Sequence, residues 1–305
     1  MGHLFRALNI AEYLRQQHTA CAVFLNCDSR ACSVLSSRQV HYETVDLADY
    51  QSDWESKLIA KYDVRVWIND RLDTDTRHTR NVIKNNIALV TFDDRGSGAA
   101  QADINVAALL FTNRTQIKGA RVLTGVEYLI VNKEIDKYKR VRKNCDNIIV
   151  TLGGSDTYGV TVRLAEILKD LGHKAVFHTG PSFEHDKQLR DVLGDQGEIV
   201  SNVPSLVKLF HEYDLAVTGG GVTPFEANAA GLPCLTVSCE THEADACRFL
   251  DKLGTSIYLG PGPDVTAESI TAALETAEIE KMSRRGMQYV TTDGIDRVFD
   301  QVRRL

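Results

Sequence analysis

The chain has 305 residues, of which 43% are hydrophobic and 25% charged, and its formal net charge is -6. This composition is close to the average of globular proteins, so it excludes fibrous and disordered classes, and the acidic balance disfavours nucleic acid as a partner. The length exceeds that of one hydrophobic core and predicts two domains of about 150 residues each.

Signals for membranes, export and metals are weak throughout the sequence. The apolar runs are strand-sized, well short of the roughly 18 residues of a membrane span, and no charged and then apolar leader opens the chain. The seven cysteines form no C-x-x-C pair and several lie in apolar strand patterns, so we expect a reducing cytoplasm. No Cys/His cluster has zinc-like spacing, and Asp70, Asp73 and Asp75 lack the rest of a calcium loop, so we expect no metal and no cofactor.

The first predicted element is a helix from Leu4 to Gln17, with apolar residues at helical spacing. An α/β domain normally opens on a strand that feeds such a helix, so we expect the first strand of this domain to be missing. Short apolar runs that alternate with helical stretches then predict strands at Cys21–Leu25, Val64–Ile68, Ala88–Phe92, Ile104–Leu109 and Tyr128–Val131. This alternation is typical of a parallel sheet.

A basic segment, residues 133–143, follows and is interpreted as a solvated linker. Strands are then predicted at Asn147–Leu152, Lys174–His178, Glu198–Asn202, Asp214–Thr218, Cys234–Val237 and Ser256–Leu259. Helices are predicted at Val160–Leu171, Ser205–Tyr213, Pro224–Ala230, Glu243–Leu253 and Ala267–Glu275. The spacings fit right-handed crossovers and predict a doubly wound sheet.

The predicted organisation is therefore two Rossmann-like domains in tandem. We expect an N-terminal domain over residues 1–132, a C-terminal domain over 146–290 and a closing helix over 291–305. The closing helix presents Ile295, Val298, Phe299 and Val302 on one face, so it is expected to pack on a domain, with the first domain as a candidate.

The strongest local signal is a strand that runs into Gly219, Gly220 and Gly221 and then into a helix. Glycines let a ligand approach the backbone, and free amides at a helix start attract anions, so residues Gly219, Gly220, Gly221, Val222 and Thr223 are predicted to bind phosphates. Thr223 is the expected N-cap. Glu226 could accept bonds from ribose hydroxyls. A tight strand–helix connection and a favourable first-turn acid are the structural alternatives.

A second loop of the same design contains Gly153, Gly154 and Ser155 at the end of another strand. Open α/β sheets bind ligands at the carboxyl ends of their strands, so both loops should face one crevice. Neither loop has the spacing of an ATP-hydrolysing P-loop or of a dinucleotide-binding fingerprint.

Four further residues could carry chemistry or contact a sugar. His3 stands at a glycine-to-helix junction, where a neutral imidazole could take a proton from water, although a histidine near a terminus is usually solvated. Asp94 ends a strand and could reach the ligand, or form a structural ion pair. His242 and Glu243 begin a late helix that faces the same crevice by topology.

Four segments together resemble the PseG/SpsG family. They are G-H-x-x-R at 2–6, F-D-D-R at 92–95, V-T-L-G-G-S-D at 150–156 and T-G-G-G-V-T-P-F-E-A-N-A-A-G-L-P at 218–233. This family contains UDP-sugar hydrolases of nonulosonic acid biosynthesis, for example of pseudaminic acid biosynthesis. It also contains spore-coat polysaccharide proteins, and it is related to MurG. The resemblance covers nearly the whole chain and implies a GT-B fold, an α/β architecture of two Rossmann-like domains that face a cleft.

The resemblance also implies roles for individual residues. The diphosphate is expected to contact Gly220, Gly221 and Thr223, and the ribose is expected to contact Glu226. The crevice is completed by Gly154 and Ser155. His3 matches the histidine that activates water, Arg6 belongs to the same segment, and Tyr128 matches a tyrosine before the linker. The sequence departs from the family at His242 and Glu243, where Asn-Gln is usual, and at Met1, which stands inside the first motif.

The sequence thus predicts a cytoplasmic, inverting nucleotide-sugar hydrolase that releases a nucleoside diphosphate, UDP by resemblance, from an amino-deoxy sugar. Two alternatives stay open: a GT-B glycosyltransferase that uses the same donor, and a non-catalytic module that binds nucleotide-sugars. A further alternative is that the chain forms a fusion or a complex with a cytidylyltransferase.

Overall fold

The computed structural model describes residues 2–109, 111, 117–154, 156–180, 182–194, 197–201, 203 and 205–305. The chain divides into two compact units, which we describe separately. Unit 1 comprises Met1–Ile130 and Asp293–Leu305, and unit 2 comprises Val131–Thr292.

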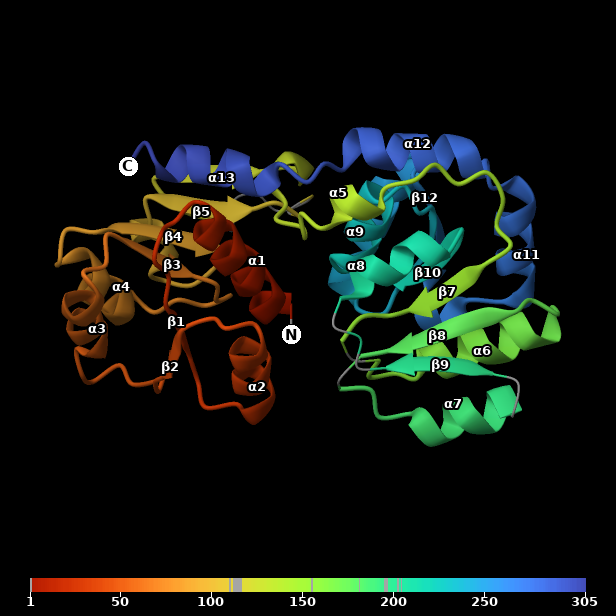
Figure 1. Cartoon of the computed structure of the whole chain (residues 1–305), viewed down its shortest axis with the longest axis horizontal. Coiled ribbons are helices and arrows are strands. Elements are labelled where there is room, and N and C mark those ends of the chain that lie inside the picture. The colour runs from red at the N-terminus through yellow and green to blue at the C-terminus, as the bar shows by residue number, and fades with distance from the viewer. Residues whose placement is uncertain are drawn as a thin grey trace. The chain divides into compact units, whose positions relative to one another are not determined.

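Unit 1 is built from parallel strands and the helices that connect them (Figure 1). Its helices are α1 (Gly2–Gln16), α2 (Ser29–Ser37), α3 (Trp54–Tyr62), α4 (Thr76–Ile83) and α13 (Gly294–Val302). Its strands are β1 (Val23–Leu25), β2 (Tyr42–Thr44), β3 (Val66–Asn69), β4 (Ala88–Phe92), β5 (Ile104–Ala107) and β6 (Arg121–Thr124). Within the described residues, β1 and β2 form a parallel pair, and β3 to β6 form a separate parallel sheet in chain order.

Apolar side chains on both faces of the β3–β6 sheet form the core of unit 1. One face packs Val90, Phe92 and Val106 against α1 and α13, and the other packs Trp67 and Leu89 against α3 and α4. Successive side chains of a strand point to opposite faces, so these buried strands need apolar residues at nearly every position. The closing helix therefore packs on unit 1.

The predicted strand at Tyr128–Val131 is wrong. The last strand of unit 1 lies earlier, at Arg121–Thr124, and Val126–Tyr128 forms a short 3-10 helix, η3. The physical cause is Gly125, whose φ of +117° lies where residues with a side chain rarely fit, so the chain turns directly after β6.

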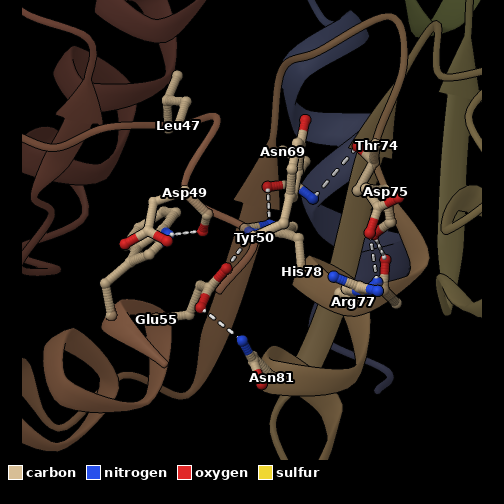
Figure 2. Close-up of polar contacts among 12 residues, drawn as sticks. Leu47, Asp49, Tyr50, Glu55, Asn69, Thr74, Asp75, Arg77, His78 and Asn81 are labelled. Carbon is tan, nitrogen blue, oxygen red and sulfur yellow. Dashed lines mark hydrogen bonds and ion pairs between the residues drawn. The ribbon is translucent and has the colours of Figure 1, made fainter. Parts of the chain in front are cut away.

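A buried polar network links α3 and α4 to the end of β3 (Figure 2). His78 lies between Glu55, 2.7 Å from its Nδ1, and Asn69, 3.0 Å from its Nε2. The indole N–H of Trp67 donates to the same Asn69 oxygen at 2.9 Å, and the Asn69 amide donates to Thr74 at 3.5 Å. Because an indole N–H can only donate, the Asn69 oxygen must be the acceptor of both bonds. This network fixes the carboxyl end of β3.

Unit 2 is a doubly wound parallel sheet with strand order β12-β11-β10-β7-β8-β9. The strands are β7 (Ile148–Thr151), β8 (Ala175–Thr179), β9 (Glu198–Ser201), β10 (Leu215–Gly219), β11 (Cys234–Ser238) and β12 (Ser256–Pro261). The helices are α5 (Ile135–Tyr138), α6 (Val160–Asp170), α7 (Asp186–Leu193), α8 (Leu206–Leu209), α9 (Thr223–Ala229), α10 (Ala244–Leu253), α11 (Ala267–Thr276) and α12 (Ile279–Tyr289). The strand order reverses between β7 and β10, which places the topological switch point there.

The basic segment before β7 is not wholly solvated, so that prediction is wrong at Arg140 and Arg142. The Arg142 side chain is fully buried and donates to four carbonyl oxygens, those of Arg140, Phe210, Tyr213 and Ala230. Arg140 donates to the Tyr213 carbonyl and to Asp214, both at 2.8 Å. The two arginines therefore attach the start of unit 2 to the loops around β10.

Candidate functional site

The two glycine loops of unit 2 lie against each other at the switch point. Thr151 at the end of β7 pairs in register with Thr218 on β10. Beyond these residues, a Cβ added at Gly219 would lie 3.4 Å from the Leu152 carbonyl oxygen. On the other side, a Cβ at Gly180, after β8, would lie 2.4 Å from the Gly153 oxygen. Glycine at 180 is therefore required for the loops to fit together, a role that the sequence analysis missed.

In the loop after β7, a side chain accepts hydrogen bonds from the first amides of the helix that follows, α6. Asp156 is buried and its carboxylate accepts from the amides of Val160, at 3.0 Å, and Thr161, at 2.6 Å. These bonds satisfy the start of α6, so a ligand phosphate could not take that place without displacing Asp156. Gly153 has a φ of +96°, which glycine adopts readily. Ser155 lies outside the described residues.

The loop after β10 differs, because no side chain among the described residues caps it. Helix α9 begins at Thr223 with Val222 at the N-cap position and no side-chain cap, so the prediction that Thr223 is the N-cap is wrong. Gly219 and Gly220 are buried, whereas Gly221 is exposed and Val222 is 37% exposed. The backbone of this loop is thus packed on one side and open on the other.

Glu226 lies one turn into α9 and is half-buried. Burial raises the pKa of its carboxyl to about 7, although the amide of Asn132, 3.4 Å from Oε1, partly opposes the rise. A carboxyl group in this range changes charge near neutral pH, so any ligand hydroxyl that donates to it should bind the ionised form better.

Ligand binding at Glu226 should depend on the ionisation of its carboxyl group. A ligand that needs the carboxylate should bind more tightly as the pH rises through the pKa, by about tenfold between pH 6 and pH 8. Calorimetric titrations of UDP across this range should show this gain in the wild type and a smaller one in Glu226→Gln, whose amide does not titrate. UDP's own titration is common to both proteins, so equal gains would exclude a contact between Glu226 and the nucleotide.

Glu243 supports the same loop from the other side. Its Oε2 accepts from the amides of Cys239, at 2.8 Å, and Glu240, at 3.3 Å, and so caps the short turn η6 (Thr241–Glu243) before α10. A Cβ added at Gly220 would lie only 2.6 Å from the Glu243 Cβ and 2.8 Å from its carbonyl oxygen. His242 is exposed. Glu243 therefore restricts the conformation of the loop after β10.

The two buried glycines of this loop provide a matched pair of variants. Gly220→Ala forces a methyl group against the Cβ and carbonyl oxygen of Glu243 and the Sγ of Cys247, whereas Gly219→Ala meets nothing closer than 3.4 Å. We expect the Kd for UDP to rise at least about tenfold in Gly220→Ala, a loss of about 1.4 kcal/mol, and to stay within about threefold in Gly219→Ala. Equal losses in the two folded variants would show that the loop's shape does not determine binding.

Unit 1 carries a group of paired side chains at the start of α1 and the ends of β3 and β4. His3 Nδ1 lies 2.6 Å from Asp70 Oδ1. Arg6 contacts Asp70 through Nε, at 2.7 Å, and through Nη2, at 2.5 Å, and Asp93 through Nη1, at 2.7 Å. The Arg6 guanidinium also lies over the Phe92 ring, 4.8 Å from its centroid. His3 and Arg6 are three residues apart on one helix, so they share a face.

The sequence analysis did not single out Asp70 as functional, and Asp93 entered it only within the segment F-D-D-R. Asp70 directly follows β3, and acidic residues at the carboxyl end of a parallel strand are the signal that could have identified it. Arg6, predicted as a sugar contact, donates instead to two carboxylates of its own unit.

Two other predicted sugar contacts are buried to different degrees. Asp94 is 0% exposed and accepts from the amides of Thr74, at 3.0 Å, and Gly96, at 2.8 Å, so it joins the loops after β3 and β4. A direct contact with a sugar does not fit this burial, because the carboxylate faces the protein interior. Tyr128 packs against the cluster formed by β4, β5, α1 and α13.

Across the described parts of the chain, no group of three or more His, Cys, Asp or Glu side chains could hold a metal ion. Within the same residues, no helix is both long and apolar enough to cross a membrane.

No protein-family model matches the chain. The spore coat polysaccharide biosynthesis protein SpsG of Bacillus subtilis is 24% identical over 287 aligned positions, which cover 88% of this chain and 83% of SpsG. An uncharacterized protein of Methanocaldococcus jannaschii is 24% identical over 337 aligned positions, which cover 97% of this chain and 68% of that protein.

Solved structures share the fold over almost the whole chain. MurG of Acinetobacter baumannii aligns with a TM-score of 0.70 at 15% identity, over 100% of this chain and 96% of MurG. The UDP-GlcNAc 2-epimerase of Neisseria meningitidis, bound to UDP-GlcNAc, gives 0.62 at 13% identity, over 100% and 97%. The spinosyn forosaminyltransferase SpnP gives 0.64 at 11% identity, over 98% and 95%. The predicted fold class and resemblance are confirmed: the chain is a homologue of SpsG and has the GT-B fold of MurG-type glycosyltransferases.

Proposed function

We propose that the chain is a nucleotide-sugar hydrolase that releases UDP from an amino-deoxy sugar in surface polysaccharide or nonulosonic acid biosynthesis. The observation that carries the proposal is the uncapped glycine loop at the switch point of unit 2, Gly219–Thr223. The homology to SpsG and the fold shared with a UDP-GlcNAc-bound epimerase support it. The free thiols fit a reaction in the cytoplasm.

Unit 2 binds the nucleotide in this proposal. The backbone amides of Gly220, Gly221 and Thr223 donate to the diphosphate, and the ionised carboxyl of Glu226 accepts from the ribose hydroxyls. The crevice around the nucleotide is completed by Gly153, Gly154 and Ser155. His242 and the second oxygen of Glu243 are the proposed sugar contacts on this unit.

Unit 1 supplies the base. His3 takes a proton from a water molecule, the water oxygen forms a bond to the anomeric carbon, and the bond from that carbon to the phosphate oxygen breaks. The leaving oxygen keeps the electron pair, and loop amides stabilise the charge that develops on it. Attack from the face opposite the leaving group inverts the anomeric configuration. The His3 side chain is 47% exposed, so solvent can reach it.

A second candidate is a glycosyltransferase, because MurG and SpnP share the fold. In that reaction an acceptor hydroxyl replaces water, and turnover of the donor depends on the acceptor. A module that binds nucleotide-sugars without turnover would show neither activity.

One assay distinguishes these functions. Purified protein is incubated with UDP-2,4-diacetamido-2,4,6-trideoxyhexose in buffer without any acceptor, and UDP release is followed. We expect multiple turnovers per enzyme. Binding of UDP without release would contradict the hydrolase and leave the transferase or the binding module.

A further inference from the structure

The short contact between His3 and Asp70 determines which nitrogen of the imidazole carries the proton. An ionised carboxylate can only accept hydrogen bonds, so Nδ1, 2.6 Å from Asp70 Oδ1, must be the donor. The lone pair then lies on Nε2, at the opposite edge of the ring. Asp70 is only 13% exposed, whereas His3 is 47% exposed, so the carboxylate lies on the protein side of the imidazole.

Arg6 keeps Asp70 ionised and fixes its orientation. Its Nε and Nη2 contact the two Asp70 oxygens separately, and this two-point geometry fixes the plane of the carboxylate. Burial alone would raise the pKa of Asp70, but the hydrogen bonds from Arg6 and His3 outweigh it and hold the pKa below its usual value. Asp93 shares Arg6 through Nη1 and so holds the guanidinium in place.

The backbone that carries Asp70 is fixed as well. Asn69, the residue before it, is 4% exposed and takes part in the buried network with His78 and Thr74 (Figure 2). It also accepts from the indole N–H of Trp67. Groups that must hold a reactive side chain within a few tenths of an ångström are best placed on such rigid elements. The end of β3 therefore holds the backbone of Asp70 rigidly, as a residue that positions another side chain requires.

We propose that Asp70 is a positioning residue that holds His3 in the tautomer with the proton on Nδ1, leaving Nε2 free to accept a proton. The kinetic part of this inference rests on the proposed function, whereas the tautomer does not. Arg6 and Asp93 complete the charged surroundings of His3 on α1 and at the ends of β3 and β4.

The tautomer can be measured without any turnover. Long-range 1H–15N spectra of the histidine-labelled full chain distinguish the two neutral tautomers, and His3→Ala identifies the His3 signals. At a pH where the ring is neutral, we expect a protonated Nδ1 at His3 in the wild type and a mixture of tautomers in Asp70→Asn. A predominantly Nε2-protonated ring in the wild type would overturn the proposal, even if UDP-sugar is not hydrolysed.

The kinetic effect follows from the same contact. In Asp70→Asn we expect kcat to fall at least about 100-fold, as when the acid of a catalytic triad is made neutral, with little change in the Kd for UDP. A merely structural role would lower kcat without changing the tautomer of His3 seen in the spectra.

Asp73→Asn is the matched control, because Asp73 is an exposed carboxylate on the loop that Asp70 begins. It removes the same charge nearby without touching His3, and we expect a wild-type kcat and a wild-type tautomer at His3. Equal losses of kcat in the two variants would assign the effect to net charge and contradict the positioning role. An unchanged tautomer in Asp70→Asn would contradict it as well.

Discussion

Replacing His3 with alanine should lower kcat for UDP release by about 10³-fold, because general base catalysis contributes roughly 10² to 10⁴ in rate. The variant should bind UDP with a Kd within about twofold of the wild type, since the proposed nucleotide contacts all lie in unit 2. Steady-state kinetics and calorimetry on the same preparations measure the two quantities.

The matched control is His18→Asn, which removes another exposed imidazole just beyond the end of α1. Asparagine is chosen because residue 18 has a φ of +54°, a conformation that asparagine tolerates better than alanine. The control should keep wild-type kcat. If His3→Ala also kept it, another group would have to be the base, and the assignment of unit 1 to the chemistry would fail.

Replacing Arg142 with methionine should cost unit 2 about 4 kcal/mol of unfolding free energy. The guanidinium is fully buried and donates to four carbonyl oxygens, and methionine fills similar space without any donor. Each carbonyl left unpaired costs about 1–3 kcal/mol, although water that enters would recover part of it. Removing one partner from a buried charged pair or network has similar consequences, about 3–5 kcal/mol.

Urea unfolding, monitored by a spectroscopic signal that reports on unit 2, measures this loss of unfolding free energy. Lys143→Met is the matched control, because Lys143 is exposed and lies next to Arg142 in sequence. Exposed substitutions usually change stability by less than about 0.5 kcal/mol. If both variants lost equally little unfolding free energy, the buried hydrogen bonds of Arg142 would not be what attaches residues 133–143 to the loops around β10.

The fold could be predicted from local patterns because parallel α/β sheets carry strong ones. Buried strands such as Ile148–Thr151 and Leu215–Gly219 each begin with three consecutive apolar residues, and helices of regular period separate them. The pattern failed at Tyr128–Val131, where the apolar residues belong to η3 and the chain beyond it, because Gly125 had already ended the strand. Apolar runs of this length do not distinguish a strand from other buried segments.

The site was less predictable, because its decisive contacts join residues far apart in sequence. His3 and Asp70 are 67 residues apart, and only the packing of α1 beside β3 and β4 brings them together. Asp156 and Glu243 each cap their own turn, which composition cannot reveal, and the burial of Arg142 is hidden in a run of basic residues. Glycine loops are visible in a sequence because they restrict residue type, whereas ion pairs place few restrictions on their neighbours.

In the proposed hydrolysis, water attacks the anomeric carbon of a nucleotide-sugar. Turnover of UDP-2,4-diacetamido-2,4,6-trideoxyhexose in H₂¹⁸O, without an acceptor and followed by mass spectrometry and NMR of the products, reports where the water oxygen goes. We expect one ¹⁸O atom in the free sugar, none in UDP, and an inverted anomeric configuration in the first product formed. Label in UDP, or no turnover until an acceptor is added, would rule this reaction out.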